Sequence, residues 1–228
     1  MSIADIGPLS SDERIVLLVP HPDDEALSSS GLMQQAASQG ATMRIVIATD
    51  GARLGRFMRS IRRKELLKSA KYSGIDSTCF EYYDFKDGNL AFEDRLTGRI
   101  QQTLDTFHPT MIITTDPMDI HPDHAAIGKC LRERVVMPAS LRRIYGVLIH
   151  YPGFPRPIGR HPETMLVPPA KLSAPGTAEW VQYRLSPSEQ DLKRQAIATY
   201  RSQGAHIPLA GWLLQSFDRP NELFHVLG

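Results

Sequence analysis

The stretch that decides the fold is Ile15-Val-Leu-Leu-Val-Pro-His-Pro-Asp-Asp-Glu25. Its first five residues are all apolar, which is typical of a strand buried on both faces in a parallel sheet. The polar residues follow at once, where the chain turns into a helix that we predict over residues 25–39. Because open α/β sheets bind ligands outside the carboxyl ends of their strands, this turn is a candidate functional site.

Outward from this stretch, short β-rich runs alternate with longer helical runs. Further strands are predicted at 42–49, 77–81, 110–114 and 143–150, and further helices at 59–72, 92–107 and 123–136. Repeated strand–helix–strand units imply right-handed crossovers. The expected fold class is α/β, a three-layer sandwich with a mostly parallel central sheet covered by helices on both faces.

The last third of the sequence is less regular. Prolines and glycines crowd residues 151–178, which we interpret as a Pro-rich flap, either a plain surface connection or part of a substrate mouth. A strand is predicted at 179–185 and a helix at 186–202, with Ser186 as its cap and Pro187 in its first turn. We expect residues 1–228 to form a single domain.

Composition excludes several classes of protein. The 228 residues include 26 Lys and Arg against 25 Asp and Glu, a net charge of +1 that predicts no broad attraction to nucleic acid or a membrane. No apolar run approaches the roughly 20 residues of a transmembrane segment. Two cysteines are too few for a disulfide framework, and no leader precedes the first strand, so a cytoplasmic location is expected. No phosphate-binding loop or dinucleotide fingerprint appears.

A second polar motif, His121-Pro-Asp-His124, follows the predicted strand at 110–114 and a short loop. Two strand ends therefore each offer histidine and carboxylate, a mixture that binds divalent metal ions. A catalytic zinc site needs three protein ligands and one open position, and the residues that can supply the three are His21, Asp24 and His124. Asp23 and His121 then remain for proton transfer and charge stabilisation. In the alternative, the aspartates of the first motif only cap the helix.

The two motifs together resemble those of the PIG-L/LmbE superfamily of zinc-dependent N-deacetylases, which includes N-acetylglucosaminyl deacetylases. Two weaker motifs of that family are matched by Arg62-Arg-Lys-Glu65 and Tyr200-Arg-Ser-Gln203. The sequence departs from the family pattern at Pro20, where many members have Ala, and at Asp119, where some place a catalytic Tyr.

The resemblance implies a Rossmann-like fold and a zinc-dependent hydrolase that removes an N-acetyl or other acyl group from an amino-sugar-containing substrate. It implies one Zn²⁺ per chain, held by His21, Asp24 and His124, with another divalent metal left open. Asp23 would act as general base on the zinc-bound water. The expected partner is a small glycoconjugate substrate, which could carry a phosphate or a nucleotide. The sequence leaves open whether the chain forms a homo-oligomer.

Three further residues are assigned roles with alternatives. A protonated His121 is expected to stabilise the oxyanion or to protonate the leaving amine, and Asp123 to orient His121 or merely to cap the next helix. The resemblance implies that Arg62 lies near the substrate carbonyl or the released carboxylate, whereas helix spacing alone would allow it to pair on the surface with Glu65 or Asp76. Arginines recur at 53, 56, 59 and 62, as a solvated face or as an anion-binding rim.

Two competing functions remain at the level of sequence. The first is a zinc-dependent hydratase of an unsaturated small dicarboxylic acid, which the resemblance also allows because a few members of the superfamily have that activity. The second is a non-catalytic module that binds metal for structural reasons only. Asp23 argues against the second, because a closed structural site has no need of an extra carboxylate.

Overall fold

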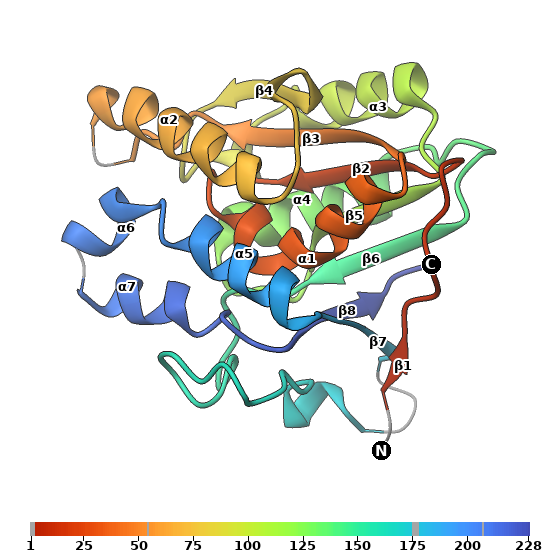
Figure 1. Ribbon diagram of the computed structural model, residues 1–228. Helices are drawn as coiled ribbons and strands as arrows, with labels where there is room; N and C mark the ends of the chain where they lie inside the picture. Colours follow the sequence, from red (N-terminus) through yellow and green to blue (C-terminus); the bar gives the residue numbers. More distant parts are fainter. Residues whose placement is uncertain (1–2, 54, 175–177, 207) are drawn as a thin grey trace.

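A computed structural model describes residues 3–53, 55–174, 178–206 and 208–228 (Figure 1). The strands are β1 (Ala4–Asp5), β2 (Arg14–Val19), β3 (Thr42–Thr49), β4 (Phe80–Phe85), β5 (Met111–Thr115), β6 (Arg143–Val147), β7 (Trp180–Arg184) and β8 (Asn221–Val226). The α-helices are α1 (Asp24–Ser38), α2 (Arg56–Tyr72), α3 (Leu96–Phe107), α4 (Pro122–Arg134), α5 (Pro187–Ile197), α6 (Arg201–His206) and α7 (Pro208–Gln215). Three short 3₁₀ helices are η1 (Ser77–Cys79), η2 (Leu90–Phe92) and η3 (Ala170–Leu172).

The strands form one sheet in the order β1-β7-β8-β6-β5-β2-β3-β4. Strand β8 runs antiparallel to β6 and β7, and the other neighbours are parallel. The prediction of a mostly parallel α/β sheet is therefore confirmed. From β2 the chain moves outward to β3 and β4 and then returns to the other side of β2 as β5. This reversal makes the carboxyl ends of β2 and β5 the place where such sheets bind ligands.

Strand β2 is buried on both faces, as its unbroken apolar run predicts. Ile15, Leu17 and Val19 pack into the core layer that contains α1, α2 and α5. Val16 and Leu18 point the other way, into the layer that contains α3 and α4. Two helical layers thus enclose the sheet and hold β2 rigidly where the polar turn begins.

The predicted continuous helix at 186–202 is wrong at residues 198–200, which separate α5 from α6. Its start is as expected, because Ser186 and Glu189 form a reciprocal capping box. The helix ends at Ile197, where the Thr199 hydroxyl donates to the carbonyl oxygen of Ala196 (2.7 Å) and competes with the helical backbone. The chain then resumes as α6, and α7 and β8 follow in a region to which the sequence assigned no element.

Residues 77–81 differ from the sequence prediction, and the predicted flap at 151–178 has little regular structure. Residues 77–81 were predicted as a strand, but a 3₁₀ turn capped by Asp76 occupies 77–79 and the strand begins at Phe80. In the predicted flap, the described residues contain η3 and one isolated bridge between Tyr151 and Phe154. Positions 175–177 of that flap lie outside the described residues.

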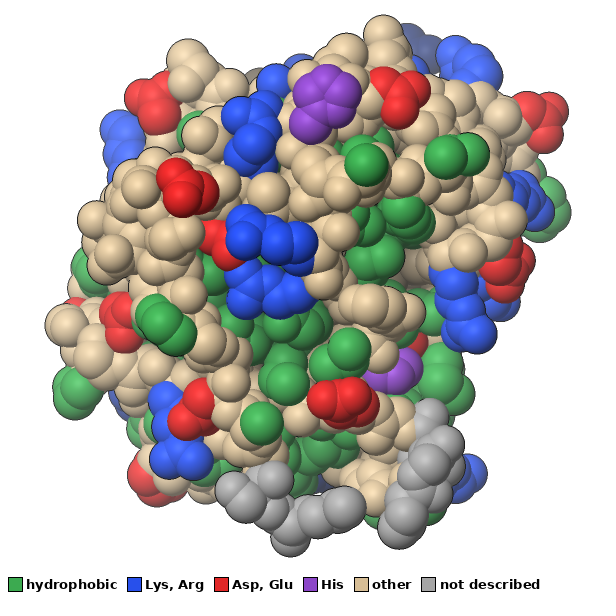
Figure 2. Space-filling model, turned by 90° about the vertical axis from the view of Figure 1, so that its right-hand side faces the viewer, with side chains coloured by type: hydrophobic (Ala, Val, Ile, Leu, Met, Phe, Trp, Pro, Cys, Tyr) green, Lys and Arg blue, Asp and Glu red, His purple; other side chains and the backbone are tan. Residues whose placement is uncertain are grey.

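The surface of one side of the molecule is visible in Figure 2, which looks onto the side where both chain termini lie in Figure 1. Lys and Arg, Asp and Glu, and apolar side chains are interspersed on this side. Among the described residues, no helix combines the length and hydropathy required to cross a lipid bilayer.

Candidate active site

A cleft of about 400 Å³ opens at the carboxyl ends of β2 and β5. It is lined by His21, Asp23, Asp24, Leu27, Arg53, Arg62, Asp87, His121, His150, Gln203, Leu213 and Leu214. Five of the seven predicted site residues are in this set. The other two, Asp123 and His124, lie directly behind it in the first turn of α4, fully buried.

The turn between β2 and α1 holds its polar groups in fixed directions. Asp24 accepts the backbone N–H of His21 (2.8 Å), which ties the start of α1 back to the strand end. Asp23 has φ of 126°, a conformation that non-glycine residues rarely adopt. Its own N–H donates to the carboxylate of Glu25 (2.9 Å). This hydrogen bond from Asp23 to Glu25 thus stabilises the strained backbone conformation of Asp23.

The potential metal-ligating atoms of His21, Asp24 and His124 lie close together, with each ring nitrogen nearest a different oxygen of Asp24. His21 Nδ1 lies 3.4 Å from Asp24 Oδ2, His124 Nε2 lies 3.5 Å from Asp24 Oδ1, and the two ring nitrogens are 3.3 Å apart. Ligands about 2.0–2.1 Å from a tetrahedral zinc ion lie about 3.4 Å from each other. The two imidazoles and the carboxylate of Asp24 are therefore spaced closely enough to bind one metal ion together.

Two further groups that could hold a metal share His21. One adds His121 and His124, the other adds Asp87 and Asp123, and within each group the ligand atoms lie within 4.8 Å of one another. The described part of the chain thus concentrates its candidate metal ligands in this one cleft.

The histidines of the proposed ligand set are oriented by buried carboxylates. Asp123 Oδ2 lies 3.2 Å from His21 Nε2, and the same carboxylate accepts the N–H groups of Gly88 (2.7 Å) and Leu90 (3.0 Å). Asp119 Oδ2 lies 3.3 Å from His124 Nδ1. Carboxylates in this position fix which ring nitrogen faces a metal and raise its basicity.

The expected partnership between His121 and Asp123 is wrong, because Asp123 contacts His21 instead. His121 packs beside other imidazoles, with ring centroids 4.9 Å from His21 and 4.8 Å from His124. Burial, aided by those two rings, lowers the pKa of His121 to about 4. This lowered pKa favours a neutral imidazole at neutral pH over the protonated His121 expected from the sequence.

Arg62 lies inside the site. Its side chain is buried, with Nη2 3.1 Å from Asp23 Oδ2 and 2.6 Å from the carbonyl oxygen of Pro22. Nη1 lies 3.7 Å from Asp87 Oδ2. Burial raises the pKa of Asp23 to about 7, and the charge of Arg62 opposes that rise. The surface pairing of Arg62 with Glu65 or Asp76 is not found among these contacts.

The other arginines of the predicted rim do not share one cleft. Arg53 lines the active-site cleft, whereas Arg56 and Arg59 line a separate hollow of about 330 Å³. Arg59 is paired with Asp84 at 2.6 Å. Of the two interpretations left open by the sequence, a solvated face or an anion-binding rim, the described arginines do not form a single rim around one cleft. The flap also contributes no residue to the cleft lining among the positions that the structure describes.

Sequence reasoning missed two carboxylates of the site. Asp87 follows β4, and its Oδ1 lies 3.4 Å from His21 Nε2. Its position just after a strand end was the signal that could have identified it. Asp119 was noted only as a departure from the family pattern. His150 also lies in the lining, with its ring 5.0 Å from that of His124.

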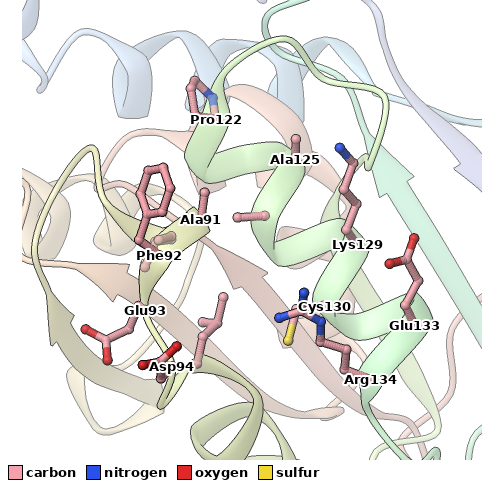
Figure 3. Close-up of a pocket in the computed structure, with 13 residues that line it drawn as sticks. Ala91, Phe92, Glu93, Asp94, Pro122, Ala125, Lys129, Cys130, Glu133 and Arg134 are labelled. Atoms are coloured by element: carbon pink, nitrogen blue, oxygen red, sulfur yellow. The ribbon is translucent and has the colours of Figure 1, made fainter.

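A different hollow of about 340 Å³ lies between η2 and α4 (Figure 3). Its labelled side chains include Glu93 and Asp94 on one wall and Lys129, Glu133 and Arg134 on the other. The charges there are mixed in sign, and no histidine lines it. The groups with metal-binding chemistry therefore belong to the first cleft.

Comparison with known proteins places the chain in a family. The family described as PIG-L, GlcNAc-PI de-N-acetylase, matches residues 16–135, just over half of the chain. A probable N-acetyl-alpha-D-glucosaminyl L-malate deacetylase 2 of Bacillus cereus is 34% identical over 148 residues, which are 58% of this chain and 66% of that protein. The chain thus spans just under two thirds of that relative.

Two solved structures show the same fold. The N,N'-diacetylchitobiose deacetylase of Pyrococcus horikoshii superposes with a TM-score of 0.63 at 20% identity, covering 95% of this chain and 84% of that one. The 4-carboxy-2-hydroxymuconate hydratase of Pseudomonas putida superposes with a TM-score of 0.58 at 16% identity, covering 90% and 82%. The family match, which includes both metal-site motifs, establishes that this chain belongs to the PIG-L family.

Proposed function

We propose that the protein is a zinc-dependent hydrolase that removes an N-acetyl group from an amino-sugar-containing substrate. The observation that carries this proposal is the carboxylate of Asp23, which lines the same cleft as His21 and Asp24. The ring nitrogens of His21 and His124 lie 3.3 Å apart, and each is within 3.5 Å of an oxygen of Asp24. A metal site with an open position and an adjacent base is the arrangement required for metal-assisted hydrolysis. The names of the relatives support amide hydrolysis on amino sugars.

His21, Asp24 and His124 would hold the ion. When bound, zinc supplies Lewis acidity, which polarises an acyl carbonyl and lowers the pKa of a water molecule. Asp123 and Asp119 would keep the two imidazoles in the tautomers that leave the donor nitrogens free. Another divalent ion would use the same donors, so metal identity is settled by metal analysis of the purified protein.

Asp23 would be the general base. Its carboxyl group is buried and held 3.1 Å from Arg62, and its pKa of about 7 suits proton exchange near neutral pH. It accepts a proton from water as the water oxygen attacks the amide carbon. The same proton can then pass to the departing nitrogen, so that acetate and a primary amine leave the site.

His121 would stabilise the charge that develops on the carbonyl oxygen. As a neutral imidazole it donates one N–H, which is sufficient for a hydrogen bond to an oxyanion. Arg62 would keep Asp23 in place and balance the negative charge of the two aspartates beside it. Leu27, Leu213 and Leu214 give the cleft apolar walls, and Arg53 and Gln203 give it polar ones.

The test is acetate release from a panel of N-acetylglucosaminyl compounds, measured after the protein is loaded with zinc. Release of equal amounts of acetate and primary amine supports the proposal. Loss of ultraviolet absorbance from an unsaturated dicarboxylic acid, without acetate release from any compound, would instead assign the hydratase chemistry of the same fold.

A further inference from the structure

A buried hydrogen-bond network lies directly behind Asp23. One carboxylate oxygen of Glu25 accepts the N–H of Asp23 (2.9 Å). The other accepts the hydroxyl of Ser69 (3.2 Å) and the phenolic hydroxyl of Tyr200. Glu25 and Tyr200 are each 2% exposed, and they lie 175 residues apart in sequence.

Helices α6 and α7, together called the roof here, contribute Gln203, Leu213 and Leu214 to the cleft lining. Tyr200 directly precedes α6. The hydroxyl of Tyr200 therefore ties this roof to the turn that holds Asp23. A buried phenol without such a partner would be unfavourable, so the bond also fixes where the roof sits.

Asp23 requires this support because of its backbone. Its positive φ is costly for a residue with a side chain, and no side-chain cap satisfies this end of α1. The Glu25 carboxylate is the acceptor that holds the strained amide, and Arg62 holds the side chain from the opposite direction. A shift of the Glu25 carboxylate would rotate the Asp23 peptide and move its carboxylate in the cleft.

We propose that Glu25 and Tyr200 form a positioning pair that sets the orientation of Asp23 and couples it to the seating of the α6–α7 roof. The inference rests on the proposed function of Asp23 as general base. Glu25 and Tyr200 act through Asp23 and make no contact with substrate.

The chain offers a matched control on the same roof. Ser202, two residues after Tyr200, donates its N–H (2.9 Å) and its hydroxyl (2.6 Å) to the carboxylate of Glu65 on α2. This second anchor also attaches the roof to the body of the protein, but among the described contacts it does not involve Asp23. Tyr200→Phe and Ser202→Ala each remove one hydroxyl from the roof and so separate positioning from general anchoring.

The two variants are expected to change different kinetic constants. Tyr200→Phe should lower kcat about tenfold with KM within about twofold, because only the step that uses Asp23 is impaired. Ser202→Ala should raise KM about three- to tenfold with kcat nearly unchanged, because the roof is looser but the base is still aligned. Metal content should equal that of the wild type in both variants.

Hydrogen exchange gives a readout that does not depend on turnover. In Tyr200→Phe, exchange of a peptide covering residues 20–27 should accelerate about tenfold, because the Asp23 amide loses a fixed acceptor. In Ser202→Ala this peptide should exchange as in the wild type. Glu25→Gln keeps an acceptor oxygen and should retain more protection there than Glu25→Ala, provided that both variants fold as judged by circular dichroism.

Two outcomes would overturn the positioning pair. The first is equal exchange of residues 20–27 in Tyr200→Phe and wild type. The second is a change in KM alone in Tyr200→Phe, which would make Tyr200 an ordinary roof anchor. A wild type that releases no acetate but shows the expected exchange pattern would refute the proposed function and leave the structural coupling in place.

Discussion

Replacing Asp119 by Asn tests whether a buried carboxylate organises the metal site from behind. Asp119 accepts three backbone N–H groups, from His121 (2.8 Å), Ile149 (3.0 Å) and His150 (2.9 Å). It also faces His124 Nδ1 at 3.3 Å. One side chain thus joins the loop before α4 to the end of β6 and orients a proposed ligand.

The size of the effect follows from these contacts. Asparagine keeps one acceptor oxygen but turns an NH₂ group toward at least one backbone N–H. A lost charge-assisted bond costs about 1.5–3 kcal/mol, and the surviving bonds become weaker because the acceptor is neutral. We therefore expect the free energy of unfolding to fall by about 3 kcal/mol. A weaker partner for His124 should lower zinc affinity about 10- to 100-fold.

Urea unfolding and competition with a chromophoric chelator measure the two quantities separately. Asp116→Asn is the matched control, because Asp116 is equally buried in the same loop but contacts His225 (2.6 Å) and the N–H of Met118 (2.8 Å). It should lose stability and keep its zinc affinity. Zinc affinity of Asp119→Asn within twofold of wild type, or an equal loss in Asp116→Asn, would refute the reasoning.

Three further predictions concern packing, a buried ion pair and the metal. Gly128→Ala should lower the free energy of unfolding, measured in urea, by about 3 kcal/mol, because the new Cβ would lie 2.5 Å from backbone atoms of residues 115 and 117. Gly98→Ala is the control, because its Cβ would enter open space, and it should be neutral or stabilising. Lys193→Met should lower the free energy of unfolding by about 3–5 kcal/mol, because the buried Glu222 carboxylate loses its charged partner at 2.8 Å. The double variant with Glu222→Gln should recover part of that stability. Chelation of the metal should lower the thermal midpoint, and zinc present at about 1,000 times its Kd should restore about 4 kcal/mol; an unchanged midpoint would contradict a bound metal.

The centre of the fold could be predicted because its physical signals are local. An unbroken apolar run has few alternatives to a strand buried on both faces, and Ile15–Val19 is such a run. The polar groups that follow β2 and β5 converge because parallel strands end at one edge of the sheet. The donor atoms of His21, Asp24 and His124 come together for that reason.

Predictions that relied on closeness in sequence were wrong. Asp123 is two residues from His121, but His121 has the extended backbone of a residue just before α4 whereas Asp123 lies in the first helical turn, and the Asp123 carboxylate contacts His21. The alternative of an arginine rim also relied on spacing in the sequence. Each step of three residues turns about 60° short of a full circle, so Arg56 and Arg62 point about 120° apart on α2. Only the second of these reaches the cleft.

Other features depend on contacts that no local pattern encodes. The acceptor of the Tyr200 hydroxyl is Glu25, and the choice follows from how α5, just before Tyr200, packs against α1 and α2. The carboxylate of Glu222 on β8 accepts N–H groups of Gly31 and Leu32 within α1, which periodicity cannot reveal. A Cβ at Gly31 would lie 2.8 Å from Leu185, so the glycine permits close packing at a point far away in the sequence.

The measurement that tests the central claim most directly is the activity and metal content of Asp23→Asn. The account predicts one zinc per chain in both wild type and variant, because Asp23 is not among the proposed ligands. It predicts acetate release at least about 1,000-fold slower in the variant, because asparagine cannot accept the proton. Acetate release at the wild-type rate would contradict the account, and so would loss of the metal together with activity.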